Sequence, residues 1–281
     1  NPPPPPARSF VFGGPSTLAW RMLFWAQSPV LKTVLGIVLL SCSPLPTLQQ
    51  LALSTAVHWL LIGTCMTLGY HRFASHHAFH LERLAQFVGV TLTQIGWQGG
   101  ALWWAAKHRR HHKHCDQPLD PHSWAQTSFM YALLGWTLFE TETEPEYVPK
   151  HLLFPELWVL NTFHALPGVC VLAAIHALWG WDAMVWGYLV PSCTSAIQTF
   201  HFNLEFHPPE NEAKCKSRNE LGEKIISWLP STLVGEARHD DHHNAPQRAL
   251  RPGGDPPYWL VLAPLKALGV ITRVHDELRY A

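Results

Sequence analysis

The chain has 281 residues, of which only 14% are charged, and its 20 Lys and Arg residues balance its 20 Asp and Glu residues. A typical soluble domain carries about 25% charged residues, and a net charge of zero gives no electrostatic basis for binding nucleic acid. We therefore expect no nucleic-acid partner. The six cysteines form no Cys-x-x-Cys pair, so we expect reduced thiols rather than a disulfide framework.

Residues 1–28 form a lead that precedes the main domain. The lead opens on a proline run, Asn1–Pro6, which predicts an extended segment. It closes on an aromatic stretch, Trp20–Trp25, which is typical of a membrane interface. We expect residues 29–281 to form a single domain.

Two pairs of long apolar segments follow the lead. Thr33–Tyr70 contains no charged residue and is broken in the middle at Pro44 and Pro46. Leu157–Trp181 and Ala183–Leu204 are likewise free of charge. About 20 apolar residues suffice to cross a bilayer, and Pro-rich breaks mark turns. We therefore expect four transmembrane helices, at about 30–43, 47–70, 157–181 and 183–204.

Three histidine clusters lie at the ends of these spans or between them. They are His71, His76 and His77 in HRFASHH, His108, His111 and His112 in KHRRHHKHCD, and His239, His242 and His243 in HDDHH. Residues three and four apart share one face of a helix, and neutral imidazole is the commonest metal ligand near neutral pH. The second and third clusters therefore each predict a helical face with three metal ligands.

Two further segments of low charge could also lie in or at the membrane. Leu84–Ala106 is long enough to span, but a crossing there would put the first and second clusters on opposite sides of the membrane. Its Gln94, Gln98 and Gly99 also suit a buried path better than lipid, so we expect no span. Ala125–Phe139 is too short to span and is expected at the interface.

The charges indicate the orientation. With this topology all 20 Lys and Arg residues lie on the side of the histidine clusters, which by the positive-inside rule faces the cytoplasm, or the stroma of a plastid. We expect an all-α integral membrane protein of four transmembrane helices. A cytoplasmic helical cap, formed by 71–156 and 205–281, would hold a His-rich two-metal site.

The clusters offer about eight imidazoles, which are too many for one ion, and nitrogen ligands suit iron, copper or zinc. Two metals beside apolar helices suggest oxygen activation on a lipid-like substrate. Asp240 and Asp241 either orient the imidazoles or form a solvated acidic pair. We expect Cys115 to be a filler position. The histidines expected to be ordinary surface residues are His80, His114, His122, His151 and His275.

HRFASH, KHRRHHKHCD and HDDHH resemble, in this order, the three histidine boxes of the membrane fatty-acid desaturases. WQGGALWWAAKHRRHH, LDPHS, PELWVLN, SRN and GEARHDDHHNAP are similar to further stretches of that family, above all of its acyl-CoA Δ9 (stearoyl-type) members. The likeness covers roughly residues 20–280. It implies a di-iron, O2-dependent enzyme that introduces a cis double bond, at Δ9, into a saturated acyl-CoA or acyl-lipid.

The resemblance also implies the ligands of the two irons. They are His71, His76, His108, His111, His112, His207, His239, His242 and His243, with Asn203 acting through a water. Asn203 and His207 match an Asn-x-x-x-His element of the family. Departures from the family pattern fall on residues that are not ligands: His77, Leu204, Ala237, Arg238, Asp240 and Asp241.

The residues beside the second box are candidates for lining an acyl tunnel: Trp97, Gly99, Gly100, Trp103 and Trp104. The electron donor is expected to be a separate protein, cytochrome b5 or a ferredoxin, because RPGG at Arg251–Gly254 lacks the histidine of the cytochrome b5 haem motif. We expect the endoplasmic reticulum membrane, with plastid and bacterial inner membranes left open. Two alternatives remain: a lipid hydroxylase on the same scaffold, and a metal transporter or receptor, which would place its ligands within the spans.

Overall fold

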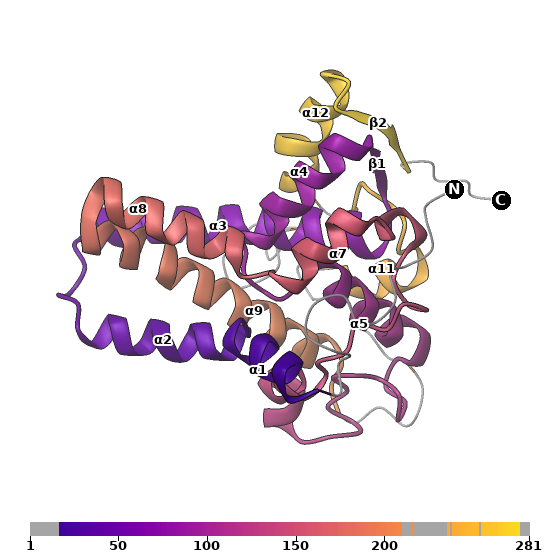
Figure 1. The fold of residues 1–281 in the computed structure, drawn as a ribbon. Coiled ribbons are helices and arrows are strands. Elements are labelled where there is room, and N and C mark those ends of the chain that lie inside the picture. Colours follow the sequence, from indigo (N-terminus) through magenta and orange to yellow (C-terminus); the bar gives the residue numbers. More distant parts are fainter. Residues whose placement is uncertain (1–16, 210–214, 216–234, 237, 253, 276–281) are drawn as a thin grey trace.

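The computed structural model describes residues 17–209, 215, 235–236, 238–252 and 254–275. Most of the predicted proline-rich lead, over residues 1–16, and Ala237 lie outside this part of the chain. The described part divides into a helical arm and a compact body that carries the histidine clusters (Figure 1).

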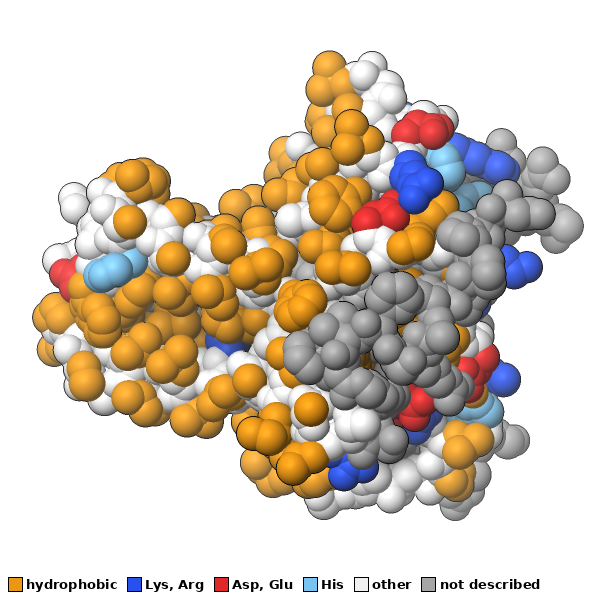
Figure 2. All heavy atoms as spheres, viewed as in Figure 1, with side chains coloured by type: hydrophobic (Ala, Val, Ile, Leu, Met, Phe, Trp, Pro, Cys, Tyr) orange, Lys and Arg blue, Asp and Glu red, His pale blue; other side chains and the backbone are white. Residues whose placement is uncertain are grey.

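The arm consists of four long helices that extend to one side of the body (Figure 1): α2 (Pro29–Ser41), α3 (Leu48–Leu60), α8 (Leu166–Met184) and α9 (Val190–Phe206). The π-helix η1 (Leu61–Ser75) continues α3, and η4 (Val185–Leu189) joins α8 to α9. Figure 2 shows apolar side chains over much of the visible surface of the arm. An apolar surface of this extent indicates contact with lipid.

Two continuous helices in the described residues are long and apolar enough to cross a membrane, namely Leu48–Ser75 and Leu166–Phe206. The helix α1 (Leu18–Ala26) and α2, bent by 44°, would together make a third. Leu166–Phe206 has 41 residues, about twice what one crossing needs. It is interrupted at Gly180, whose φ of 83° is not helical, close to the predicted boundary between two spans.

The predicted span at 157–181 is wrong at its beginning. The helix α7 (Pro155–Thr162) ends before Phe163, and α8 begins only at Leu166. Pro167 lies in the first turn of α8, which is the part of a helix that tolerates proline. The predicted segments 30–43 and 47–70 correspond to α2 and to α3 with most of η1, although η1 continues to Ser75 and so includes His71.

The body contains shorter elements around the end of the arm. They are β1 (Phe79–Leu81), α4 (Arg83–Gln94), α5 (Ala101–His114), η2 (Tyr131–Gly135), α6 (Trp136–Phe139), η3 (Lys150–Leu152), α11 (His239–Asn244), η5 (Tyr258–Leu262), α12 (Ala263–Ala267) and β2 (Ile271–Val274). β1 and β2 form an antiparallel pair, with Phe79 opposite Val274. This small sheet is an addition to the predicted all-α fold.

As predicted, the segment Leu84–Ala106 does not form one spanning helix. It contains most of α4 and the start of α5, separated by a break over 95–100. A residue of η1 holds this break in place, because the hydroxyl of Tyr70 donates to the carbonyl oxygen of Gly99 at 2.7 Å. The core lies at this junction, where the fully buried ring of Trp103 stacks on Trp136 at 5.2 Å.

One lysine is buried within the arm. Lys32 lies on α2, inside the span predicted at 30–43, and is 1% exposed. Its Nζ donates to the carbonyl oxygens of Trp97 at 2.9 Å and Ser192 at 2.8 Å. This side chain therefore joins α2 to α9 and to the break before α5.

We predict that Lys32→Met lowers the thermal stability of the protein in detergent. The methionine leaves the buried carbonyl oxygen of Trp97 without this donor, and such a loss costs about 1–3 kcal/mol. The carbonyl oxygen of Ser192 keeps a hydrogen bond from the hydroxyl of Ser195 at 3.0 Å. Thermal unfolding measures the effect, with Lys113→Met at an exposed position of α5 as the control. An unchanged melting temperature for Lys32→Met would contradict the structural role of this lysine.

Candidate metal centre

The second and third histidine boxes each lie on one helix, as predicted, but each helix serves two ligand groups. On α5, His108 and His112 are four residues apart and point into one group, while His111 points into the other. On α11 the arrangement is reversed, because His239 and His243 share a group and His242 belongs to the opposite one.

The first ligand group contains five imidazoles: His71, His76, His108, His112 and His242. Their Nε2 atoms meet in a chain of short contacts. His71 lies 3.0 Å from His242, His242 lies 2.9 Å from His112, His112 lies 3.0 Å from His108, and His108 lies 2.8 Å from His76. His71, His76, His108 and His242 are all buried.

The second ligand group contains four imidazoles: His111, His207, His239 and His243. The Nε2 of His239 lies 3.0 Å from that of His207 and 3.2 Å from that of His243. The ring of His111 packs edge-on against His207, at 4.6 Å between centroids. His207 comes from the end of α9, so this group joins the arm to both boxes of the body.

These contacts have the spacing that metal ligands would have. Burial lowers the pKa of His76, His108, His112, His239, His242 and His243 well below the ordinary value. The rings are therefore neutral, and several of their Nε2 atoms face one another at hydrogen-bond distance. Two nitrogens bound at right angles to one ion at about 2.1 Å would lie about 3.0 Å apart, which matches the distances in both groups.

Carboxylates hold the other nitrogen of several rings. The Nδ1 of His111 lies 2.8 Å from Asp120, and the Nδ1 of His207 lies 3.4 Å from Asp116. A carboxylate at Nδ1 fixes the tautomer that leaves Nε2 free to bind a metal. Asp120 also raises the pKa of His111 in spite of burial. Sequence reasoning missed Asp116 and Asp120, although both follow the second box closely.

A buried ionic network joins the first box to the third. Arg72 is fully buried and donates to Glu236 at 2.8 Å and to Asp255 at 2.6 Å. Glu236 in turn lies 3.3 Å from the Nδ1 of His71. Arg251 donates to the Nδ1 of His242 at 3.0 Å. Glu236 therefore supports His71 from outside, whereas Arg251, which can only donate, makes the Nδ1 of His242 an acceptor. The motifs did not reveal this network.

Several predictions about neighbouring residues need correction. His122 is buried and stacks on His111 at 4.5 Å, so it is not a surface residue. His151 is partly buried and stacks on His77 at 3.9 Å. Asp240 and Asp241 were expected either to orient imidazoles or to be solvated. The backbone carbonyl oxygen of Asp240 accepts a hydrogen bond from Asn244, and the carboxylate of Asp241 accepts one from Arg238. The carboxylates beside the ligands are Asp116, Asp120 and Glu236 instead.

The predicted tunnel residues lie around the break before α5. The ring of Trp104 stacks on His108 at 4.8 Å and thus contacts the first group directly. Trp103 donates to the carbonyl oxygen of Glu140 at 2.6 Å and Trp97 to that of Gln27 at 3.2 Å. Gly99 has a φ of 105°, which glycine adopts readily.

Two of the predicted site residues are fixed by the backbone around them. A side chain at Gly100 would collide with Asn161, which accepts a hydrogen bond from the backbone of Trp103. Asn203 lies one turn before His207 on α9. Its role as a ligand through water, like the tunnel, stays a prediction.

The expectation of reduced cysteines is wrong for one pair. Cys115, at the end of α5, forms a disulfide with Cys215, which lies 100 residues further along the chain. The Sγ of Cys115 lies 3.6 Å from the Nδ1 of His207, and the Sγ of Cys215 lies 3.6 Å from the Nδ1 of His243. The disulfide therefore lies against the outer edge of the second group, so Cys115 is not a filler. The other four cysteines are free.

No family model matches the chain. It is 28% identical over 213 residues to a sn-2 palmitoyl-lipid 9-desaturase of Nostoc, covering 72% of each chain. It is 26% identical over 240 residues to a sn-1 stearoyl-lipid 9-desaturase of Synechocystis, covering 81% of this chain and 70% of the relative. An acyl-CoA 5-desaturase of Anemone leveillei is 27% identical, covering 74% and 66%. These relatives support an oxidoreductase of the fatty-acid desaturase type, but not the acyl-CoA Δ9 subtype.

We predict that Asp120→Asn weakens metal binding at the second group about 10–100-fold, the usual effect of removing an orienting carboxylate. The amide cannot hold the Nδ1 proton of His111 as the carboxylate does. Elemental analysis should show the metal content falling from two ions toward one, and chelator competition should give the affinity. Asp182→Asn, at an exposed position of α8, serves as the control. Full retention of two ions at wild-type affinity would refute the role of Asp120.

We also predict that reduction of Cys115–Cys215 destabilises the protein by about 2–4 kcal/mol, as for other native disulfides. Denaturant unfolding with and without a phosphine reductant measures the difference, and Cys115→Ser should remove it. Cys170→Ser, at an exposed free cysteine, should leave it unchanged. Alkylation of both thiols in the native, unreduced protein would show that the bond is absent.

Proposed function

We propose that this protein is a di-iron, O2-dependent fatty acyl desaturase that introduces a cis double bond into a saturated acyl chain. The division of nine imidazoles into groups of five and four is the observation that supports this proposal most. It provides two all-nitrogen sites, and nitrogen ligands suit iron. The lipid desaturases among the relatives point to the same chemistry.

Bound iron would supply the activation of O2 and the removal of hydrogen from unactivated carbon. The acyl chain loses two hydrogen atoms from adjacent methylenes, and the two C–H bonds become one C=C bond. O2 takes up these hydrogens with two further electrons and two protons and leaves as two waters. The protein residues hold the imidazoles neutral, orient them from Asp116, Asp120 and Glu236, and exclude bulk water by burial.

We propose a glycerolipid as the first choice of acyl carrier and Δ9 as the position of the double bond, because two of the relatives are named lipid 9-desaturases. Acyl-CoA is the second choice, supported by the acyl-CoA 5-desaturase. Trp104, which stacks on a ligand of the first group, would form the wall that positions the reacting carbons. Trp97, Gly99, Gly100 and Trp103 would complete the tunnel.

We propose four membrane crossings, formed by α1–α2, by α3–η1 and by the two parts of Leu166–Phe206 on either side of Gly180. The length of that segment and the non-helical φ of Gly180 support a return at this point. The body would then lie at the cytoplasmic or stromal face. The electrons would come one at a time from a separate donor, cytochrome b5 or a ferredoxin. The membrane of the endoplasmic reticulum, of a plastid or of a bacterium would fit this arrangement.

We predict that a desaturase-deficient host expressing the wild-type chain makes a new cis-monoene from saturated C16 or C18 chains, and that His242→Ala abolishes it. His242 contacts two other ligands of the first group, so its loss breaks that group. Gas chromatography of the host lipids measures the product, and His201→Ala, whose side chain is 58% exposed on α9, is the control. A hydroxylated product would favour the hydroxylase alternative, and wild-type turnover by His242→Ala would refute the metal assignment.

A further inference from the structure

Two neighbouring hollows lie in the body beside η1. The first is an apolar pocket of about 160 Å³ between η1, α4 and the η5–α12 segment, with Leu92 and Leu265 among its walls. The second is a polar cleft of about 550 Å³ that extends to η3 and α5. Phe73 and Leu81 line both hollows. The two hollows therefore adjoin at these two side chains, the first apolar and the second lined mostly by polar and charged side chains.

The apolar pocket lies on a different face of η1 from the metal ligand. Its residues on this helix include Thr64, Leu68, Gly69 and Phe73. These recur every four or five residues, as expected for one face of a π-helix, in which residue i bonds to i+5. His71 falls between two of them and points into the first ligand group. The pocket is therefore separate from the proposed tunnel beside Trp104.

The elements that line the pocket also carry exposed apolar side chains that suit lipid. Leu84, Val88 and Leu92 follow one another at intervals of four along α4 and are 77%, 47% and 55% exposed. Leu260 on η5 is 74% exposed. In Figure 2 apolar side chains cover the region of α4 and α12 and give way to charged and histidine side chains where α4 begins. An apolar patch bordered in this way is typical of a membrane contact.

The polar cleft carries positive charge that no carboxylate in the described part of the chain neutralises. Arg83 does not supply it, because it pairs with Glu156 at 2.8 Å. The positive charge comes from Lys150 and Arg109, because Lys150 is exposed and Arg109 donates only to the carbonyl oxygen of Ser75 at 3.3 Å. Glu82, the acidic residue among the lining residues, is mostly exposed and lies 3.7 Å from His80.

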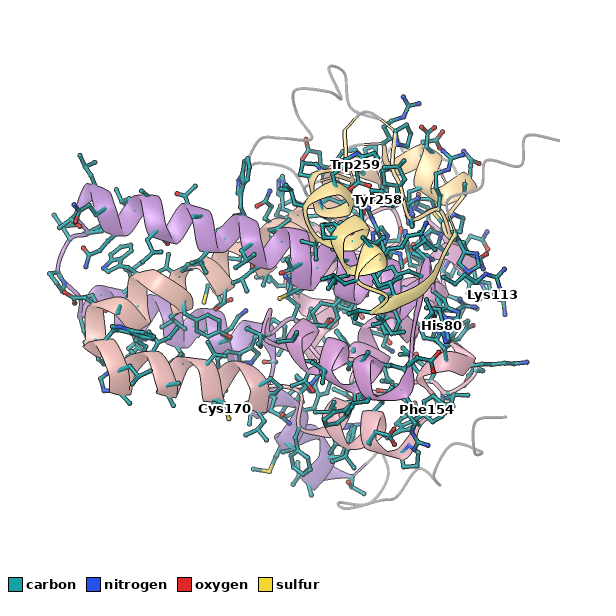
Figure 3. The ribbon with its side chains drawn as sticks, turned by 90° about the horizontal axis from the view of Figure 1, so that it is seen from above. His80, Lys113, Phe154, Cys170, Tyr258 and Trp259 are labelled. Atoms are coloured by element: carbon teal, nitrogen blue, oxygen red, sulfur yellow. A yellow bond between two sulfur atoms is a disulfide. The ribbon has the colours of Figure 1, made fainter. Side chains whose placement is uncertain are left out.

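Histidine rings complete the cleft. His77 has a φ of 52°, an uncommon conformation for a residue with a side chain, and its ring stacks on His151. Figure 3 shows His80 and Phe154, which also line the cleft, at the same end of the body. His76, a ligand of the first group, lies among the lining residues. Because His151 donates its Nε2 hydrogen to the carbonyl oxygen of Phe73 at 3.1 Å, the rings of His77 and His80 are the ones that can offer an N–H donor to an anion.

We propose that the pocket and the cleft together bind one lipid molecule, with an acyl chain in the pocket and an anionic phosphate or carboxylate headgroup in the cleft. A redox protein would need charge on a broad surface, but it would have no use for the adjoining apolar pocket. A neutral lipid would leave the cations of the cleft unpaired. An amphipathic anion would place its acyl chain in the apolar pocket and its charged headgroup beside the cations of the cleft. This site does not depend on the proposed desaturase activity.

The test is photolabelling of the full, metal-loaded chain in phosphatidylcholine nanodiscs. The probes carry one diazirine-bearing acyl chain on phosphatidylglycerol, on phosphatidylcholine or as the free fatty acid. We expect labels on the peptides of η1 and of η5–α12, with the anionic probes ahead of phosphatidylcholine. Lys150→Glu should reduce labelling by the anionic probe by more than fivefold, because it removes one basic side chain, worth about fivefold, and adds a carboxylate that repels an anion. It should leave labelling by phosphatidylcholine unchanged.

Val261→Trp fills the pocket, of which Val261 is a lining residue, and should remove the labels from η1. Leu268→Trp, at a 76% exposed residue outside the pocket lining, is the control, and equal metal content shows that both variants fold. Preference for phosphatidylglycerol identifies a phospholipid, and preference for the free acid identifies a fatty acid. Equal labelling by anionic and zwitterionic probes, or labelling unaffected by Val261→Trp, would overturn the proposal. So would slower reduction by an acidic redox protein in Lys150→Glu with lipid labelling unchanged, since the cleft would then bind a protein.

Discussion

The structure depends on the electrostatic problem posed by nine imidazoles in a space that water does not reach. Burial lowers the pKa of most of these rings, and their Nε2 atoms lie 2.8–3.2 Å apart. Neutral imidazoles at this distance either share N–H···N hydrogen bonds or bind a common cation. Where a metal ion binds such a group, its binding energy is also folding energy.

The remaining buried charged residues also support the two ligand groups. Asp116, Asp120 and Glu236 lie at the Nδ1 side of the ligands, and Arg72 neutralises Glu236. A buried carboxylate without such a partner would be costly. The cation of Arg72 thus lets a carboxylate approach the first ligand group. The ionic network is a consequence of placing ligands in the interior, and it joins segments that are far apart in the sequence.

The arrangement of α5 and α11 explains how two short helices can serve two metal sites. Each carries histidines at i, i+3 and i+4. On α5 the histidines at i and i+4 belong to the first ligand group, whereas on α11 the histidines at i and i+4 belong to the second group. Both helices therefore contribute to both sites, and neither site can form unless the two boxes are in place. The arm supplies His71 and His207 and so fixes this centre relative to the apolar helices.

The sequence by itself determined the histidine boxes, most of the apolar helices and the non-spanning segment between the first two boxes, because these follow from local spacing and from charge-free runs. Only the tertiary structure decided which imidazoles share a group, since residues on one helical face can still point to different partners. It also revealed the buried hydrogen bond of Lys32, the disulfide Cys115–Cys215 and the burial of His122. These depend on residues brought together across the chain, and the spacing of residues along a sequence carries no information on such contacts.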